Sequence, residues 1–174
     1  MKRQRKLALL LATAVTTLVV TGIAAASLLD AYRDAIPATF RYYLNVDAAI
    51  ADGYSFRLPD KTGATCIEQP GEGGMGVHMV NTSLLDGTIN SKRPEVLVYE
   101  PRAGGKLRLV AVEYVVFESD WKGSSPPALY GQEFDYADAN NRYGLPPFYA
   151  LHSWVWKQNP SGLLHAWNPD VDCN

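Results

Sequence analysis

Three side chains in this sequence, His78, Glu113 and His152, are of types that can share one metal ion or one proton. Two imidazoles and one carboxylate are a ligand set for Zn²⁺, Fe²⁺, Mn²⁺ or Cu²⁺ that leaves positions open for water or substrate. Such a centre polarises a carbonyl group or activates water. Without a metal, Glu113 and a histidine could act as an acid and base pair, or each histidine could make a structural hydrogen bond. All three interpretations stay open, because no local metal-binding motif joins these residues.

Other residues compete for places in this site. Glu72, Glu100 and Tyr114 are substitutes for the third ligand. The remaining histidine, His165, is predicted to face a residue four positions from His152 along one strand, and therefore lies about 13 Å from it. His165 is accordingly not expected to bind the same ion as His152.

Glu113 lies in the second strand of a predicted hairpin over residues 94–118, with the turn at residues 102–105. Side chains two apart along a strand share a face. The face that holds Glu113 is otherwise apolar and consists of Leu107, Leu109, Ala111, Val115 and Phe117. A buried carboxylate needs a proton, a cation or hydrogen-bond donors, so this position predicts a partner for Glu113.

The two histidines belong to other predicted strands. His78 lies in the strand-like run 77–80, directly after a glycine-rich segment with Gly71, Gly73 and Gly76 in G-x-G-x-x-G spacing. We reject dinucleotide binding for this segment, because the motif is followed by a strand and not by a helix. The glycines are instead expected to adopt positive φ or to let the backbone pass close to a bulky group. His152 lies in a predicted strand over residues 148–157.

Taken together, the pattern predicts an α+β fold, with a mainly antiparallel, curved sheet of four to five strands and an N-terminal helical region packed on it. The helical region is residues 28–52, with Gly53 as its stop. Residues 121–147 show no periodicity, and a connection of this length is usually a binding loop or a lid. A pocket is expected between this loop and the sheet.

Aromatic residues support a different kind of site. Tyr114, Trp154 and Trp156 could line a pocket for a small-molecule ligand in a non-catalytic binding module. Alternating tryptophans on a strand are more often part of a core. A cell-envelope interaction protein without pocket chemistry is the third alternative to a metal-binding protein or an enzyme that acts on a small molecule.

The first 26 residues have the order of a secretory signal peptide, with a basic start, an apolar run and Ala24-Ala25-Ala26 before Ser27. Residues 27–174 are then one secreted or cell-envelope domain. An uncleaved signal would be the only membrane anchor expected. Sixteen basic residues less the four of the signal leave twelve against 18 acidic ones, a formal charge of −6. Such a domain is a poor nucleic-acid binder.

The two cysteines, Cys66 and Cys173, both lie in the exported part of the chain. An oxidising compartment favours a disulfide between them, which would tie the C-terminal end to the early part of the domain. No Cys-x-x-Cys spacing supports a reactive thiol.

Four segments together resemble an uncharacterised family of small exported bacterial proteins: Gly73-Gly74-Met75-Gly76-Val77-His78 with Val80-Asn81, Pro94-Glu95-Val96-Leu97-Val98-Tyr99-Glu100-Pro101, Leu107-Arg108-Leu109-Val110-Ala111-Val112-Glu113-Tyr114, and His152-Ser153-Trp154-Val155-Trp156 through Asn159-Pro160-Ser161-Gly162. The similarity spans residues 32–173. The resemblance transfers no activity. It implies that His78, Glu113 and His152 lie inside the segments that define the pattern, and that His165 lies outside them.

Overall fold

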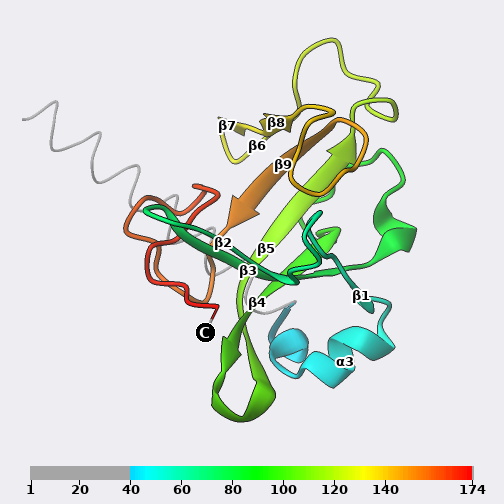
Figure 1. Ribbon diagram of the computed structural model, residues 1–174. Helices are drawn as coiled ribbons and strands as arrows, with labels where there is room; N and C mark the ends of the chain where they lie inside the picture. Colours follow the sequence, from blue (N-terminus) through cyan, green and yellow to red (C-terminus); the bar gives the residue numbers. More distant parts are fainter. Residues whose placement is uncertain (1–39, 174) are drawn as a thin grey trace, which may run out of the picture. The chain divides into compact units, whose positions relative to one another are not determined.

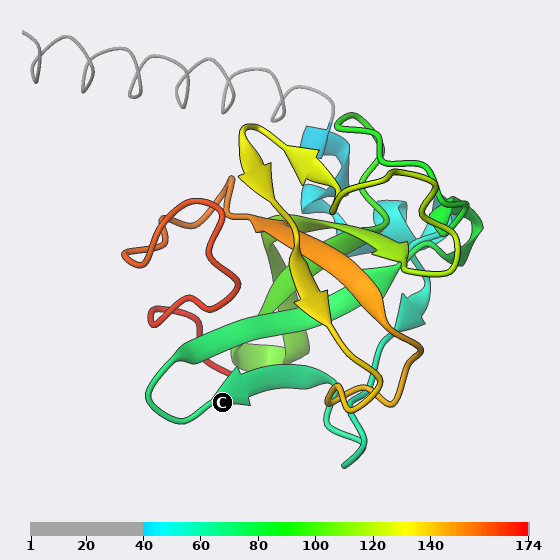
Figure 2. The same ribbon diagram turned by 90° about the horizontal axis from the view of Figure 1, so that it is seen from above.

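The computed structural model describes residues 40–173, in which one curved antiparallel sheet holds most of the regular structure (Figures 1 and 2). Its seven strands are β1 (Phe56–Arg57), β2 (Cys66–Gln69), β3 (Gly73–Val80), β4 (Val96–Arg102), β5 (Lys106–Phe117), β8 (Asp135–Ala137) and β9 (Phe148–Ser153). They pair in the order β1-β3-β4-β5-β9-β8, and β2 also pairs with β3. A separate two-stranded hairpin is formed by β6 (Ala128–Leu129) and β7 (Gln132–Glu133).

The mainly antiparallel sheet confirms the predicted sheet-rich fold, but the sheet has more strands than the predicted four to five. The additional strands β1, β2 and β8 have only two to four residues each. Segments this short cannot show an alternating pattern, so their pairing depends on the neighbouring strands. The strand predicted over residues 148–157 ends earlier, at Ser153.

Part of the predicted helical region lies in the described residues. It is a 3-10 turn over Arg41–Leu44 followed by α3 (Val46–Ala51). The side chain of Asn45 caps α3 by accepting a hydrogen bond from the Asp47 backbone at 3.0 Å. Gly53, with φ 98°, follows its end as predicted. The hydroxyl of Tyr99 on β4 donates to the carbonyl of Tyr43 at 2.7 Å, which joins this segment to the sheet. Residues 28–39 of the predicted region lie outside the described residues.

The central hairpin consists of β4 and β5, joined by a turn over Ala103–Gly105 as predicted. Its register contains a bulge, because Val98 pairs with Ala111 whereas Tyr99 pairs with Leu109. The predicted alternation therefore holds from Ala111 to Phe117 and is interrupted at Val110. In Figure 1 the hairpin end extends beyond the rest of the sheet.

The glycines of β3 lie where other chain segments pass very close. A Cβ at Gly73 would lie 2.2 Å from the carbonyl oxygen of Asn168, and one at Gly76 would lie 2.7 Å from that of Tyr99. Both glycines also have positive φ, 101° and 103°. The expected role of the glycine-rich segment is thus confirmed.

The predicted disulfide between Cys66 and Cys173 is present, and it closes a sequence separation of 107 residues. It is consistent with an extracellular or other oxidising location. The signal peptide predicted at residues 1–26 lies outside the described residues and stays a prediction. Within residues 40–173, no helix has the length and apolar character needed to cross a membrane.

Candidate metal centre

Strand register places His78, Glu113 and His152 on one face of the sheet. His78 on β3 pairs with Val98 on β4, and Val96, two residues earlier on β4, pairs with Glu113 on β5. Glu113 in turn pairs with His152 on β9. Paired residues share a face, and so do residues two apart on one strand. The cluster therefore follows from pairing among four strands.

The three side chains converge on one point. Nε2 of His78 lies 3.3 Å from Nε2 of His152 and 3.6 Å from Oε2 of Glu113. The other carboxylate oxygen, Oε1, lies 3.5 Å from Nδ1 of His152. One donor atom from each residue can be chosen so that all three lie within 4.8 Å of one another. The predicted convergence of these three residues is therefore present in the structure.

All three residues are buried, and burial governs their protonation. Burial raises the pKa of Glu113 to about 8, and the neighbouring carboxylate of Glu95 acts in the same direction. Burial lowers the pKa of His78 to about 4, although an interaction with the Gly76 backbone partly opposes this. The pKa of His152 is also well below its ordinary value, first through burial and then through His78. At neutral pH both imidazoles are therefore neutral.

The separations can be compared with those of hydrogen bonds and of metal ligands. Normal hydrogen bonds of these groups span about 2.7–3.2 Å, whereas the carboxylate oxygens lie 3.5 and 3.6 Å from the imidazole nitrogens. Ligands bound about 2.0–2.1 Å from a tetrahedral Zn²⁺ are about 3.3 Å apart. The 3.3 Å distance between the two Nε2 atoms fits both a long hydrogen bond and a pair of zinc ligands, whereas the 3.5 Å contact of Glu113 uses the other nitrogen of His152, Nδ1. A set with one donor atom from each residue lies within 4.8 Å, which is compatible with a metal site.

The segment between β8 and β9 contributes Tyr143 next to the cluster and Arg142 to the lining of the adjoining cavity. The ring of Tyr143 lies 6.2 Å from the ring of His78, edge-on, and its hydroxyl donates to the sulfur of Met75 at 3.6 Å. Arg142 is held by Asp60 and by the carbonyl of Glu68, both at 3.3 Å, and its guanidinium lies 5.5 Å from the centre of the Trp167 ring. These contacts attach this segment to distant parts of the chain.

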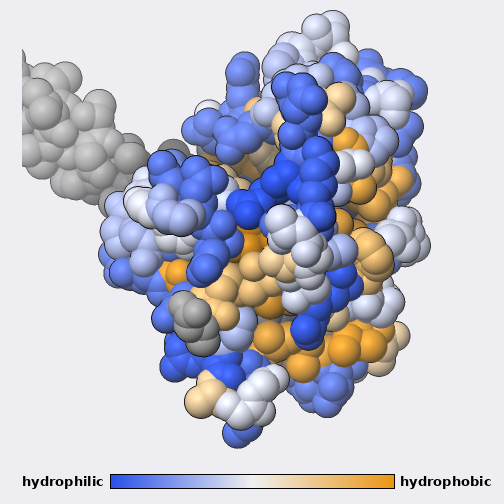
Figure 3. Space-filling model, in the orientation of Figure 1, coloured by the Kyte–Doolittle hydropathy of each residue, from blue (hydrophilic) through white to orange (hydrophobic). Residues whose placement is uncertain are grey.

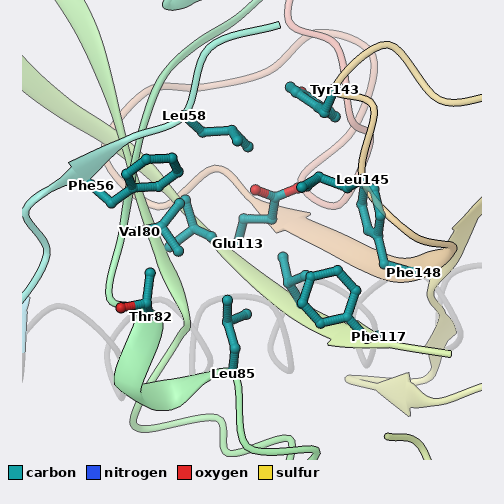
Figure 4. Close-up of a pocket in the computed structure, with 12 residues that line it drawn as sticks. Phe56, Leu58, Val80, Thr82, Leu85, Glu113, Phe117, Tyr143, Leu145 and Phe148 are labelled. Carbon is teal, nitrogen blue, oxygen red and sulfur yellow. The ribbon is translucent and has the colours of Figure 1, made fainter. Parts of the chain in front are cut away.

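Glu113 lines two cavities. The first, of about 230 Å³, is almost entirely apolar (Figure 4). The second, of about 480 Å³, lies between the predicted loop and the sheet, and both His152 and Glu113 line it. Tyr143 and Phe148 line both cavities. Of the three cluster residues, Glu113 lines both cavities and His152 lines the larger one.

The substitutes for a third ligand have other roles or places. Glu100 is buried in ion pairs with Arg102, Arg108 and Lys157. Glu72 is exposed on the turn between β2 and β3. The hydroxyl of Tyr114 donates to the carbonyl of Ser91 at 3.0 Å. His165, which we excluded from the site, is exposed, and its Nδ1 lies 3.0 Å from the carbonyl oxygen of Trp167.

The aromatic residues predicted to bind a ligand lie mainly in the core. Tyr114 and Trp154 are 0% and 1% exposed, and the indole N–H of Trp154 donates to the carbonyl of His165. Trp156 is half-buried. None of the three lines either cavity at the cluster. Ligand binding by these three residues stays a prediction.

Sequence reasoning did not place Arg142, Tyr143 or Phe148 at the site. All three line the larger cavity. For Arg142 and Tyr143, the only signal in the sequence is that they lie in residues 121–147, the segment predicted to be a binding loop or a lid. Tyr143 is an aromatic residue in a segment without periodicity, so its sequence position alone does not distinguish a cavity wall from a core contact. Phe148 and His152 lie four residues apart on β9 and therefore share a face of the sheet.

Comparison of the chain with models of protein families, with curated proteins and with solved structures found no match.

Proposed function

We propose that this protein binds one divalent transition metal through His78, Glu113 and His152, and that the metal acts on a small molecule held in the adjoining cavities. The carrying observation is a buried carboxylate that lies between two buried imidazoles at spacings longer than hydrogen bonds. A buried carboxylate without hydrogen-bond donors is costly, and a cation relieves that cost. The metal would also replace the proton that burial otherwise keeps on Glu113 below pH 8.

The donor set supports a first-row metal such as Zn²⁺ or Fe²⁺. Neutral imidazoles are the form that binds metal, and the lowered pKa of His78 keeps its ring neutral at physiological pH. Nε2 is the His152 nitrogen that faces His78, whereas Nδ1 faces Glu113. Glu113 therefore either completes the ligand set through Oε2 or orients the His152 ring through Oε1.

Three protein ligands leave at least one coordination position for water or substrate. His152 and Glu113 both line the larger cavity, so an open position on that side is accessible to a polar molecule. A metal there would supply Lewis acidity or an activated water. Catalysis on a small molecule, with His78, Glu113 and His152 as its centre, is the activity that we propose. Secretion through residues 1–26, and the relationship to small exported bacterial proteins, belong to the same proposal.

Metal analysis of the full chain, produced without an affinity tag, tests the metal site. We expect about one equivalent of Zn²⁺ to remain after dialysis, and less than about a tenth of that in His78→Ala and His152→Ala. We expect Glu113→Gln to weaken binding by about 10- to 100-fold, the range for a ligand or its supporting carboxylate.

His165→Ala is the matched control, because His165 is exposed and bonded locally to Trp167. All three histidines of the chain lie in the described residues, and both cysteines are in the disulfide. No free thiol therefore competes for the ion. Metal that remains in His78→Ala, or a wild-type protein that retains none at micromolar Zn²⁺, would contradict the proposal.

A metal-free acid and base pair is the second candidate, and the raised pKa of Glu113 favours it. A carboxyl group with a pKa of about 8 gains and loses a proton near neutral pH, which is the property of a general acid or base. Glu113 also lines both cavities. Activity that persists after removal of all metal, and that is lost in Glu113→Gln, would select this candidate.

A further inference from the structure

We infer that the small molecule is amphipathic, with one polar group that binds at the metal and one apolar tail that fills the smaller cavity. This inference rests on the proposed function and specifies its class of ligand. The tail would be a single aromatic ring or a chain of about six to eight carbons, since an apolar cavity of about 150 Å³ accepts benzene and this cavity measures about 230 Å³.

The lining of the smaller cavity carries the inference. Nearly all of its side chains are aliphatic or aromatic, and the two with polar groups other than Tyr143 are Glu113 and Thr82. In Figure 4 the Glu113 carboxylate points toward Tyr143 and Leu145, whereas Thr82 and Leu85 lie at the other end of the cavity. A tail that enters from the metal end would therefore extend over apolar side chains toward Leu85.

The position of Glu113 between two unlike cavities indicates that the ligand has both a polar and an apolar part. Its carboxylate borders the apolar cavity on one side and the larger, more polar cavity on the other. The larger cavity also exposes His152, Asp138, Asn141 and Arg142 to the ligand. A molecule that is apolar throughout would leave these groups and the metal unused. A molecule that is polar throughout would lose its hydration in the apolar cavity without replacement hydrogen bonds.

Binding of straight-chain hydroxamates to the Zn²⁺-loaded full chain tests the inference, because the hydroxamate group binds the metal while the tail length varies. The series has chains of two, four, six, eight and twelve carbons, and calorimetry gives the affinities. We expect the affinity to rise about fourfold with each methylene until the cavity is full, near six to eight carbons, and then to stop rising.

Leu85→Trp should shorten the cavity at the end away from the metal. We expect it to leave the affinity for the four-carbon compound within about twofold of wild type and to weaken the eight-carbon compound at least tenfold. Leu44→Trp is the matched control, because Leu44 is half exposed and does not line the cavity. Val115→Leu is a milder second variant on the cavity wall, expected to lower the optimal tail length by about one carbon.

Metal content is measured on each sample, so that failure of the proposed metal site can be distinguished from failure of the inference about the ligand. A sample that binds no Zn²⁺ contradicts the proposed function. A sample that binds Zn²⁺ but shows equal affinity for all tail lengths overturns the inference alone. The inference is also overturned if the rise with tail length is unchanged in both Leu85→Trp and Val115→Leu.

Discussion

At the scale of single residues, burial changes which groups of the site carry a proton at neutral pH: the carboxyl of Glu113 is protonated and the imidazole of His78 is not. The carboxyl of Glu113 holds its proton up to about pH 8, and the imidazole of His78 loses its proton above about pH 4. A second buried carboxyl, Glu95, accepts a hydrogen bond from the backbone of Val115 at 2.9 Å, and burial raises its pKa to about 8 as well. Two such carboxyls near one centre make the metal-free protein sensitive to pH.

We predict that the metal-free protein loses stability as the pH rises from 6.5 to 8. In the folded state Glu95 and Glu113 have raised pKa values of about 8, against about 4.5 when unfolded, so the folded state binds more protons in this window. The histidines act oppositely, but mainly below about pH 7, because their unfolded pKa is about 6.5. We expect a fall of about 1–2 kcal/mol per carboxyl in the free energy of unfolding, measured with urea in the presence of a chelator.

Glu95→Gln is the diagnostic variant for this pH dependence, because Gln keeps an acceptor for the Val115 backbone and does not ionise. The slope between pH 6.5 and 8 should fall to about half in this variant. A slope identical to that of wild type would show that Glu95 ionises normally in the folded protein.

At the scale of elements, β3 connects the glycine-rich segment to the site. Gly76 has φ 103° and lies two residues before His78 on this strand. The carbonyl of Tyr99 on the neighbouring strand occupies the space beside it, so any side chain at position 76 would push β3 away from β4. The position of the His78 ring thus depends on a residue that has no chemistry of its own.

We predict that Gly76→Ala lowers the free energy of unfolding by at least about 1–3 kcal/mol, because it combines an unfavourable φ with a contact of 2.7 Å. It should also weaken Zn²⁺ binding by displacing His78. Gly104→Ala is the control, since Gly104 also has positive φ but no atom within 4 Å of an added Cβ. Urea titration and metal analysis of both variants test this, and equal effects in the two would exclude the role of the Tyr99 contact.

At the scale of the whole molecule, the disulfide joins the two ends of most of the described chain. Some apolar side chains are exposed on its surface. Cys66 on β2 is joined to Cys173 near the end of the chain. The segment that precedes Cys173, from Asn168 to Val171, passes close to Gly73 and Gly74 of β3. Figure 3 shows hydrophobic residues gathered between polar areas on one face. Leu44 and Ile50, in the helical segment, are 50% and 44% exposed.

We predict that the double variant Cys66→Ser with Cys173→Ser loses about 2–5 kcal/mol of stability, since the bridge constrains a long loop in the unfolded chain. Urea unfolding of wild type with and without dithiothreitol gives the same comparison without substitution. The reductant should leave the double variant unchanged. A wild-type protein that unfolds at the same urea concentration in both conditions would contradict a stabilising role for the bridge.

The sequence by itself determined the local features: the Gly104-containing hairpin, the alternation that buries Glu113, the stop at Gly53 and the pairing of the only two cysteines. These depend on residue type and short spacing, which propensity and periodicity report directly. Only the tertiary structure decided that His78 and His152 meet Glu113, because they lie 35 and 39 positions from it in the chain and are joined by strand register. The bulge at Val110, the short strands and the position of Tyr143 likewise depend on contacts between distant segments, which have no local signal.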